Sequence, residues 1–256
     1  MYQTISYRLE AGVAVITLNR PEVMNALSSQ LRAEMLSAVQ QAAAQARVLV
    51  ITGAGRAFCS GQDLGDATAA GLDLERVLNE EYVPLLKAIT DCPIPTISAV
   101  QGAAAGAGAN LALAADVVIA AESASFIQAF TRIGLVPDAG GSYWLPRQIG
   151  LARAMGAVLF ADKVTARQAA DWGMIYECVP DQGFNAHWQA RALRLAQGPT
   201  LAYRGVKTAL RASFGNDLDQ QLALEARLQG ECGATEDFRE GVAAFLEKRA
   251  AKFRGA

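Results

Sequence analysis

Histidine is nearly absent from this chain, and the scarcity excludes the commonest catalytic sets. His187 is the only one in 256 residues. A Ser-His-Asp or Cys-His triad needs a histidine beside its nucleophile, and a histidine-rich metal site needs more than one. His187 lies in a polar, helical-looking segment remote from every glycine-rich stretch, which favours a surface helix position. We therefore expect no histidine triad and no metal site.

Paired cysteines and long apolar runs are missing as well. The four cysteines are far apart and form no CxxC pair, at Cys59, Cys92, Cys178 and Cys232. This spacing indicates neither a disulfide framework nor a zinc site and favours free thiols in a reducing compartment. The first ten residues lack the apolar core of a signal peptide, and no uncharged run approaches the ~18 residues of a membrane span. We expect a cytoplasmic protein with no membrane partner.

The charges are balanced. Lys and Arg together number 23 against 25 Asp and Glu, which leaves a formal charge of −2. No broad basic footprint is available for a nucleic-acid backbone, so we expect no nucleic-acid partner. With 52% hydrophobic and 19% charged residues, the composition is that of a folded globular protein and excludes a disordered chain or a fibre.

The hydrophobic pattern predicts alternating strands and helices in the first part of the chain. The run 13–18 is a strand, a helix capped by Ser28 follows to about residue 46, and 48–52 is a buried strand. Strand, helix, strand implies a right-handed crossover and a parallel pair. A loop at 65–71 and a helix at about 72–90 come next. Further strands are expected at 94–100, 116–120, 124–126 and 175–179, and helices at 111–115, 151–161, 165–172, 184–197, 199–213 and 217–250.

Two small-residue corners stand between an apolar run and a helical run, at 58–63 and 101–110. Side chains are trimmed there so that the backbone can touch a ligand. If the corners meet, they present two backbone N–H groups to one oxygen, as an oxyanion hole requires. Close helix–strand packing explains the second corner equally well. No ordered G-x-G-x-x-G, GK[ST] or G-x-S-x-G is present, which disfavours dinucleotide, phosphate-loop and serine-elbow sites.

The motifs at 20–27, 53–64, 102–116 and 134–141 resemble, in order and spacing, those of the crotonase (enoyl-CoA hydratase/isomerase) superfamily. The resemblance covers essentially the whole chain. It implies an α/β fold: a spiral of ββα turns over residues 1–195 and a helical C-terminal region over 196–256 for trimerisation and closure over CoA. It also implies an acyl-CoA thioester substrate, a homo-trimer or dimer of trimers, and no cofactor besides the CoA of the substrate.

The same resemblance assigns the site. The oxyanion-hole donors are the backbone N–H groups of Gln62 and Ala107. Hydratases of the superfamily use two glutamates, and here those positions hold Asn110 and Phe130, which cannot exchange a proton at neutral pH. Asn110 is left to orient water or the substrate. Substrate and CoA contacts are expected at Ala57, Ser60, Gly61, Asp63, Leu64, Gly106, Phe130 and Lys248.

A carboxylate stands at Asp138, where hydratases have glycine. Its position before a glycine-led helix allows a helix N-cap, whereas isomerases of the superfamily with a single acid here use it to move a proton. The helix N-terminus favours the ionised acid and an apolar surround the neutral one, so its pKa is open. One carboxylate indicates isomerisation. A hydratase-like enzyme that activates water with Asp138 and Asn110, and a catalytically silent CoA-binding subunit, are the alternatives.

A narrower resemblance concerns the acyl group. The segments 58–64, 104–109, 134–138 and 172–175 are similar to those of the isomerases of aerobic phenylacetate degradation. These enzymes convert the ring-1,2-epoxide of phenylacetyl-CoA to oxepin-CoA, and similar members also shift a 3,4 double bond to the 2,3 position. Phe130, Tyr143 and Trp144 are candidates for lining an aromatic acyl pocket, although core packing explains such residues as well.

Overall fold

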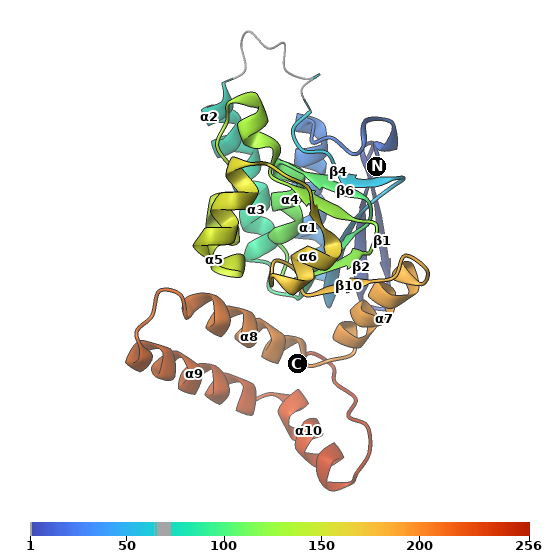
Figure 1. Ribbon diagram of the computed structural model, residues 1–256. Helices are drawn as coiled ribbons and strands as arrows, with labels where there is room; N and C mark the ends of the chain where they lie inside the picture. The colour runs from blue at the N-terminus through green and yellow to red at the C-terminus, as the bar shows by residue number, and fades with distance from the viewer. Residues whose placement is uncertain (1, 64, 66–72) are drawn as a thin grey trace.

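The computed structural model describes residues 2–63, 65 and 73–256 (Figure 1). Strands and helices alternate through a mixed α/β core, and three C-terminal helices extend away from it. Leu64 and most of the predicted loop 65–71 lie outside the described residues.

The main sheet has six strands in the order β1-β2-β3-β5-β7-β10. Strands β1 and β2 form an antiparallel pair, and every other neighbour is parallel. The predicted crossover is confirmed, because β2 and β3 pair in parallel with Val13 opposite Val48. The bounds are Ile5–Glu10 for β1, Val13–Leu18 for β2, Val48–Gly53 for β3, Thr96–Val100 for β5, Val117–Ala121 for β7 and Glu177–Val179 for β10.

A second sheet of four short strands runs in the order β4-β6-β8-β9. The long strands β3, β5 and β7 are each followed by a short strand and then by helical structure, as β3-β4-α2, β5-β6-α4 and β7-β8-η3-α5. This repeated ββα unit is the predicted crotonase-like spiral. The short strands are β4 at Ala57–Cys59, β6 at Ala103–Ala105, β8 at Ser125–Ile127 and β9 at Val164–Thr165.

Helices cover both faces of the main sheet. The predicted cap of the first helix is confirmed, since the Leu31 amide donates to Ser28 Oγ at 3.2 Å. On the other face, α7 packs Phe184 and Trp188 against the strands. The core helices are α1 at Ser29–Gln45, α2 at Leu74–Val77, α3 at Val83–Thr90, α4 at Ala107–Leu113, α5 at Gly141–Leu159, α6 at Ala166–Asp171 and α7 at Phe184–Ala196, with single turns η1 at Pro21–Val23, η2 at Leu78–Tyr82 and η3 at Ala129–Ile133.

The C-terminal helices are α8 at Thr200–Ala212, α9 at Leu218–Gly233 and α10 at Glu236–Leu246, and they stand clear of the two sheets (Figure 1). The prediction of one helix over 217–250 was wrong. Thr235 starts a new helix, because its side chain accepts the Phe238 amide at 3.0 Å. The predicted division at residue 195 falls at the end of α7. No helix in the described part of the chain has the length and apolar character to cross a membrane.

Two cations join these helices to the core. Lys207 of α8 donates to the carbonyl oxygens of Cys92 and Ile94 at 2.6 and 2.8 Å and pairs with Asp116 at 2.7 Å. Arg47, just after α1, donates to Thr200 Oγ1 at 3.0 Å. Helix α8 is thus fixed to the core at its first residue and near its middle.

Candidate active site

The two glycine-rich corners meet at one edge of the small sheet. Strands β4 and β6 are parallel, so their carboxyl ends lie side by side. Gly61 follows β4 with φ +97, and a Cβ added there would lie 2.8 Å from the Ala105 oxygen and 3.4 Å from the Ala107 nitrogen. Gly108 has a different reason, because a Cβ there would overlap the Cys59 backbone. Packing explains Gly108, and close approach of the two corners explains Gly61.

The backbone directions suit an oxyanion hole. Leu27 donates its N–H to Gly61 O at 2.8 Å and accepts the Asp63 N–H at 3.3 Å, which makes a parallel bridge opposite Gln62. In such a bridge the N–H of the middle residue is directed away from the partner strand. Ala107 is the first residue of α4, so its amide has no acceptor within the helix. Both predicted donors are therefore amides that the local hydrogen-bond pattern does not use.

The Asp138 carboxylate is not a helix cap. Helix α5 begins at Gly141, its N-cap is Gly140, and no side chain caps it. The Gly141 amide donates instead to the Asp138 main-chain oxygen at 2.9 Å. Among the described residues, the buried oxygen Oδ1 of Asp138 has no hydrogen-bond partner. Burial raises the pKa of this carboxyl from 3.8 to about 6.

Asn110 holds this acid in place. Its side chain is completely buried; Nδ2 donates to the Asp138 main-chain oxygen at 2.8 Å, and Oδ1 accepts from Gln128 Nε2 at 2.9 Å. Asn110 lies one turn along α4 from Ala107, so the predicted acid Asp138 is tied to the helix that begins at the predicted donor Ala107. The amide acts on the Asp138 backbone, a contact that the sequence did not indicate.

The aromatic candidates separate into two groups. Phe130 on η3 is buried, and its ring tip would lie 3.9 Å from a Cβ added to Gly106, so the ring borders the corner before Ala107. Tyr143 and Trp144 lie in the first turn of α5, edge to face with ring centroids 4.7 Å apart. Tyr143 is 45% exposed, whereas Trp144 packs against the core. The structure thus brings Phe130 to the predicted hole.

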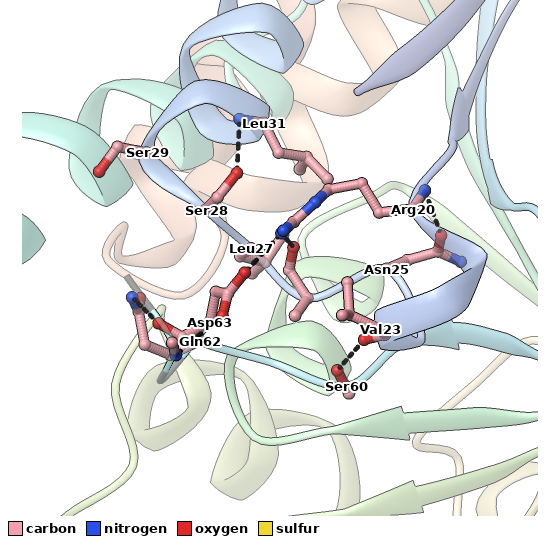
Figure 2. A network of polar contacts seen from close by, with 12 residues as sticks. Arg20, Val23, Asn25, Leu27, Ser28, Ser29, Leu31, Ser60, Gln62 and Asp63 are labelled. Atoms are coloured by element: carbon pink, nitrogen blue, oxygen red, sulfur yellow. Dashed lines mark hydrogen bonds and ion pairs between the residues drawn. The ribbon is translucent and has the colours of Figure 1, made fainter. Parts of the chain in front are cut away.

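Two predicted CoA contacts brace the first motif against the corner (Figure 2). Asp63 forms an ion pair of 2.6 Å with Arg20, whose guanidinium also donates to the Ala26 carbonyl at 2.7 Å. Ser60 Oγ donates to the Val23 carbonyl at 3.2 Å. These contacts tie the segment 20–27 to the segment 58–63 through one ion pair and two hydrogen bonds to main-chain oxygens.

The remaining predicted contacts do not all gather here. Ala57 is buried within β4, beside the corner. Leu64 lies outside the described residues. Lys248 follows α10, in the helices that Figure 1 shows apart from β4 and β6. Within one chain, Lys248 is therefore not brought to the edge that carries Gln62 and Ala107.

Sequence reasoning missed polar residues close to the predicted hole: the buried Arg32, Tyr82 and Gln128, and the partly buried Glu81. Arg32 is 2% exposed and occupies the same helix face as the buried Leu31 and Met35. A charged residue within an apolar helical stripe is the signal that could have revealed it, because a buried charge requires partners.

The enoyl-CoA hydratase/isomerase family model matches residues 8–256. The chain belongs to the enoyl-CoA hydratase/isomerase family. The crotonase resemblance and the fold class are thereby confirmed. The 1,2-epoxyphenylacetyl-CoA isomerase of Escherichia coli (strain K12) is 43% identical over 261 residues, which cover 100% of both chains. A protein of Rhodobacter capsulatus named a probable enoyl-CoA hydratase is 64% identical over 254 residues, 99% of each chain.

A solved structure supports the same assignment. The crystal structure of an enoyl-CoA hydratase from Bacillus anthracis has a TM-score of 0.92 at 33% identity and covers 99% of this chain and 100% of that one. The chain is therefore a member of an enzyme family that acts on acyl-CoA thioesters. Its named relatives include both isomerases and hydratases.

Proposed function

We propose that this family member is an acyl-CoA isomerase in which Asp138 moves a proton while the backbone N–H groups of Gln62 and Ala107 hold the thioester oxygen. The observation that carries the proposal is the unbonded, buried oxygen of Asp138, fixed by Asn110 to the helix that begins at Ala107. A silent CoA-binding subunit has no use for such a carboxylate, whose burial costs stability.

The chemistry needs one acid. Asp138 takes a proton from the carbon next to the thioester carbonyl, and the electron pair of that C–H bond moves onto the thioester oxygen. The two amides stabilise that charge, and each donor in such a hole contributes roughly 3 kcal/mol in the transition state. Asp138 then returns the same proton elsewhere on the conjugated system. For a ring-1,2-epoxide, the carbon–carbon bond shared by the epoxide and the six-membered ring also opens, and its electron pair re-forms as ring double bonds of the seven-membered oxepin. No water enters and no cofactor beyond the substrate's CoA is needed, so substrate and product have the same composition.

The substrate we propose is the ring-1,2-epoxide of phenylacetyl-CoA, with oxepin-CoA as product and a 3-enoyl to 2-enoyl shift as a further activity. The name of the Escherichia coli relative supports this choice. Phe130 beside the hole adds an aromatic surface for a ring-bearing acyl group.

Hydration of an enoyl-CoA is the second candidate, and the name of the Rhodobacter capsulatus relative favours it. In that reaction Asp138 activates water alone, because the positions where hydratases carry glutamates hold a buried amide and a phenyl ring, Asn110 and Phe130. A single acid must then both activate the water and protonate the product carbon. In isomerisation Asp138 first accepts a proton and then returns it, so one acid performs the two transfers in sequence.

The test offers the purified protein three substrates: the ring-1,2-epoxide of phenylacetyl-CoA, a 3-enoyl-CoA and a 2-enoyl-CoA. Products are identified by mass and absorbance. We expect isomers of unchanged mass, and loss of turnover in Asp138→Asn but not in Asp162→Asn, an exposed acid that serves as control. A product heavier by one water from the 2-enoyl substrate alone supports hydration. Binding of CoA without any turnover supports the silent subunit.

We also propose that the protein is a homo-trimer or a dimer of trimers in the cytoplasm. Helices α8 and α9 bury no residue, and large apolar side chains are exposed on α8 to α10 at Val206, Leu210, Leu222, Phe238 and Phe245. A cavity of about 720 Å³ also opens between these helices. Such a surface fits contact with further copies of the chain. Light scattering after size exclusion tests the state, and a monomer at micromolar concentration refutes it.

A further inference from the structure

A buried polar cluster stands behind the Gln62 peptide. The Tyr82 hydroxyl donates to Gln62 Oε1 at 2.6 Å, and Arg32 Nη1 donates to the same oxygen at 3.0 Å. Arg32 and Tyr82 are 2% and 3% exposed, and the guanidinium carbon lies 4.7 Å from the centre of the Tyr82 ring. The Gln62 side-chain oxygen is therefore held by two donors on rigid helices, one charged and one neutral.

Tyr82 is the last residue of a π turn. The Val83 amide donates to the Leu78 oxygen, five residues back, so residues 78–82 form a π turn. Such turns are rare and costly interruptions of α-helices that occur often at functional sites. Glu81 and Tyr82, which are adjacent in the chain, both contact Arg32, since Glu81 Oε2 accepts from Nη2 at 2.6 Å. The turn thus completes the bonding of a buried guanidinium.

The contacts of Arg32 converge on the backbone of the hole. Its Nη1 donates to the Leu27 carbonyl as well as to the Gln62 side chain. Leu27 is the residue whose N–H and carbonyl pair with Gly61 and Asp63, on either side of Gln62. Arg32 therefore acts on Gln62 in two ways. It bonds the Gln62 side chain directly, and it bonds the carbonyl of Leu27, the residue that pairs with the backbone on either side of Gln62.

We propose that Tyr82 and Arg32 are positioning residues for the oxyanion hole: they hold the Gln62 side-chain oxygen from behind and so fix the direction of the Gln62 N–H. The inference rests on the proposed function, because it needs an acyl-CoA thioester oxygen at that amide. Loss of the Tyr82 hydroxyl leaves one donor on Gln62 and loosens the amide. The effect falls on kcat more than on KM, since the amide bonds most strongly to the charged transition state.

The main variant is Tyr82→Phe, which removes one hydroxyl and keeps the ring over Arg32. The matched control is Tyr7→Phe, which removes the buried hydroxyl of a tyrosine on β1 that has no hydrogen-bond partner among the described residues. We expect kcat to fall about five- to tenfold in Tyr82→Phe, the typical value of one hydrogen bond, with KM changed less than twofold and no change in the control. Arg32→Lys should lower kcat further because an ammonium cannot reproduce the fork.

A readout independent of turnover uses phenylacetyl-CoA and 2-butenoyl-CoA, each with a ¹³C-labelled thioester carbonyl. A hole that polarises the carbonyl lowers its stretching frequency in the infrared difference spectrum. We expect a smaller lowering in Tyr82→Phe than in the control. Gln62→Leu should show the same smaller lowering, and Tyr82→Phe added to Gln62→Leu should change neither the frequency nor kcat further, because the hydroxyl acts through that side chain.

Several results overturn the inference. Additive losses in the double variant, an unchanged carbonyl frequency in Tyr82→Phe, or a loss that appears only as a shifted pH profile would each show that Tyr82 acts elsewhere, for example on Asp138. In one outcome the wild type lowers the carbonyl frequency, and Tyr82→Phe lowers it less, while neither protein isomerises any substrate. That result refutes the proposed isomerase and leaves the positioning role of Tyr82 intact. If neither labelled thioester binds, both are refuted. Should Tyr82→Phe not fold, Arg32→Lys takes its place in the frequency test, alone and added to Gln62→Leu, and an unchanged carbonyl frequency in Arg32→Lys overturns the inference.

Discussion

Replacing Asp138 by asparagine should stabilise the protein at pH 8 while it abolishes catalysis. Burial raises the pKa of this carboxyl from 3.8 to about 6, so the folded protein opposes ionisation. Above pH 6 the folded state must carry a charge that the unfolded chain carries more easily. Two pKa units correspond to about 3 kcal/mol of lost unfolding free energy at pH 8. Asparagine has the same shape and no charge, so the variant avoids that cost.

The advantage of the variant depends on pH in one direction. A carboxyl with a raised folded pKa contributes its full stability below the unfolded value of 3.8, and loses it as the pH rises through about 6. At pH 4 the folded carboxyl is almost fully protonated and the unfolded one is only a little more than half ionised, so the difference between Asp138 and asparagine should shrink to about half a kcal/mol. The gap between the two proteins should open mainly between pH 4 and pH 6.

Urea unfolding at 25 °C, followed by circular dichroism at one protein concentration, measures this gap at pH 4 and pH 8. Equal m-values are needed for the comparison. In parallel, kcat/KM of the wild type should rise as the pH increases through about 6, and the variant should lose about 100- to 10,000-fold in rate. A variant less stable than the wild type at pH 8, or a gap of the same size at both pH values, would refute the burial argument.

Three further substitutions test the predicted oxyanion hole, the hydrogen bonding of Asp138 and the attachment of the C-terminus. Gly61→Ala forces a side chain onto a backbone with φ +97 and against a main-chain oxygen 2.8 Å away; kcat should fall about 100-fold or more, and an unchanged kcat contradicts the hole. Asn110→Ala removes one of the two hydrogen bonds to the Asp138 carbonyl and the acceptor of Gln128 Nε2, and should cost about 1 to 3 kcal/mol in urea unfolding along with part of kcat; full activity contradicts its positioning role. Asp237→Ala removes the carboxylate that accepts the backbone amides of residues 254 and 255 at 2.6 and 2.8 Å, so mass spectrometry should show faster tryptic trimming of the C-terminus at unchanged core proteolysis.

The sequence predicted the strands and the first crossover well because their signals are local. The apolar run 13–18 and its partner at 48–52 are short, β-branched and bounded by turn residues, and the observed strands match them within a residue. Ser28 was identified as a cap because the serine immediately precedes the apolar helical face. Such features depend on neighbours in the chain, which a sequence displays directly.

Contacts between residues far apart in the chain could not be predicted from local sequence patterns. The bond from Asn110 to the Asp138 carbonyl joins residues 28 apart, and the bond from Tyr82 to Gln62 depends on a π turn that no composition signal marks. The helix predicted over 217–250 failed for a smaller reason. Thr235 is a moderate helix former in sequence, yet its side chain accepts an amide and starts a new helix there.

The pKa of Asp138 shows how the structure decides a balance that the sequence left open. A helix N-terminus lowers the pKa of an acid only when the carboxylate reaches the first amides. Here Gly140 takes the cap position and the Gly141 amide bonds the main chain of Asp138, so the side chain gains nothing from α5. Desolvation by burial is the larger effect and raises the pKa to about 6, although a hydrogen bond from the backbone of Asp138 itself opposes the rise. Such an acid is ionised at neutral pH, yet more basic than a free aspartate, and that combination suits a group that must accept a carbon-bound proton and return it.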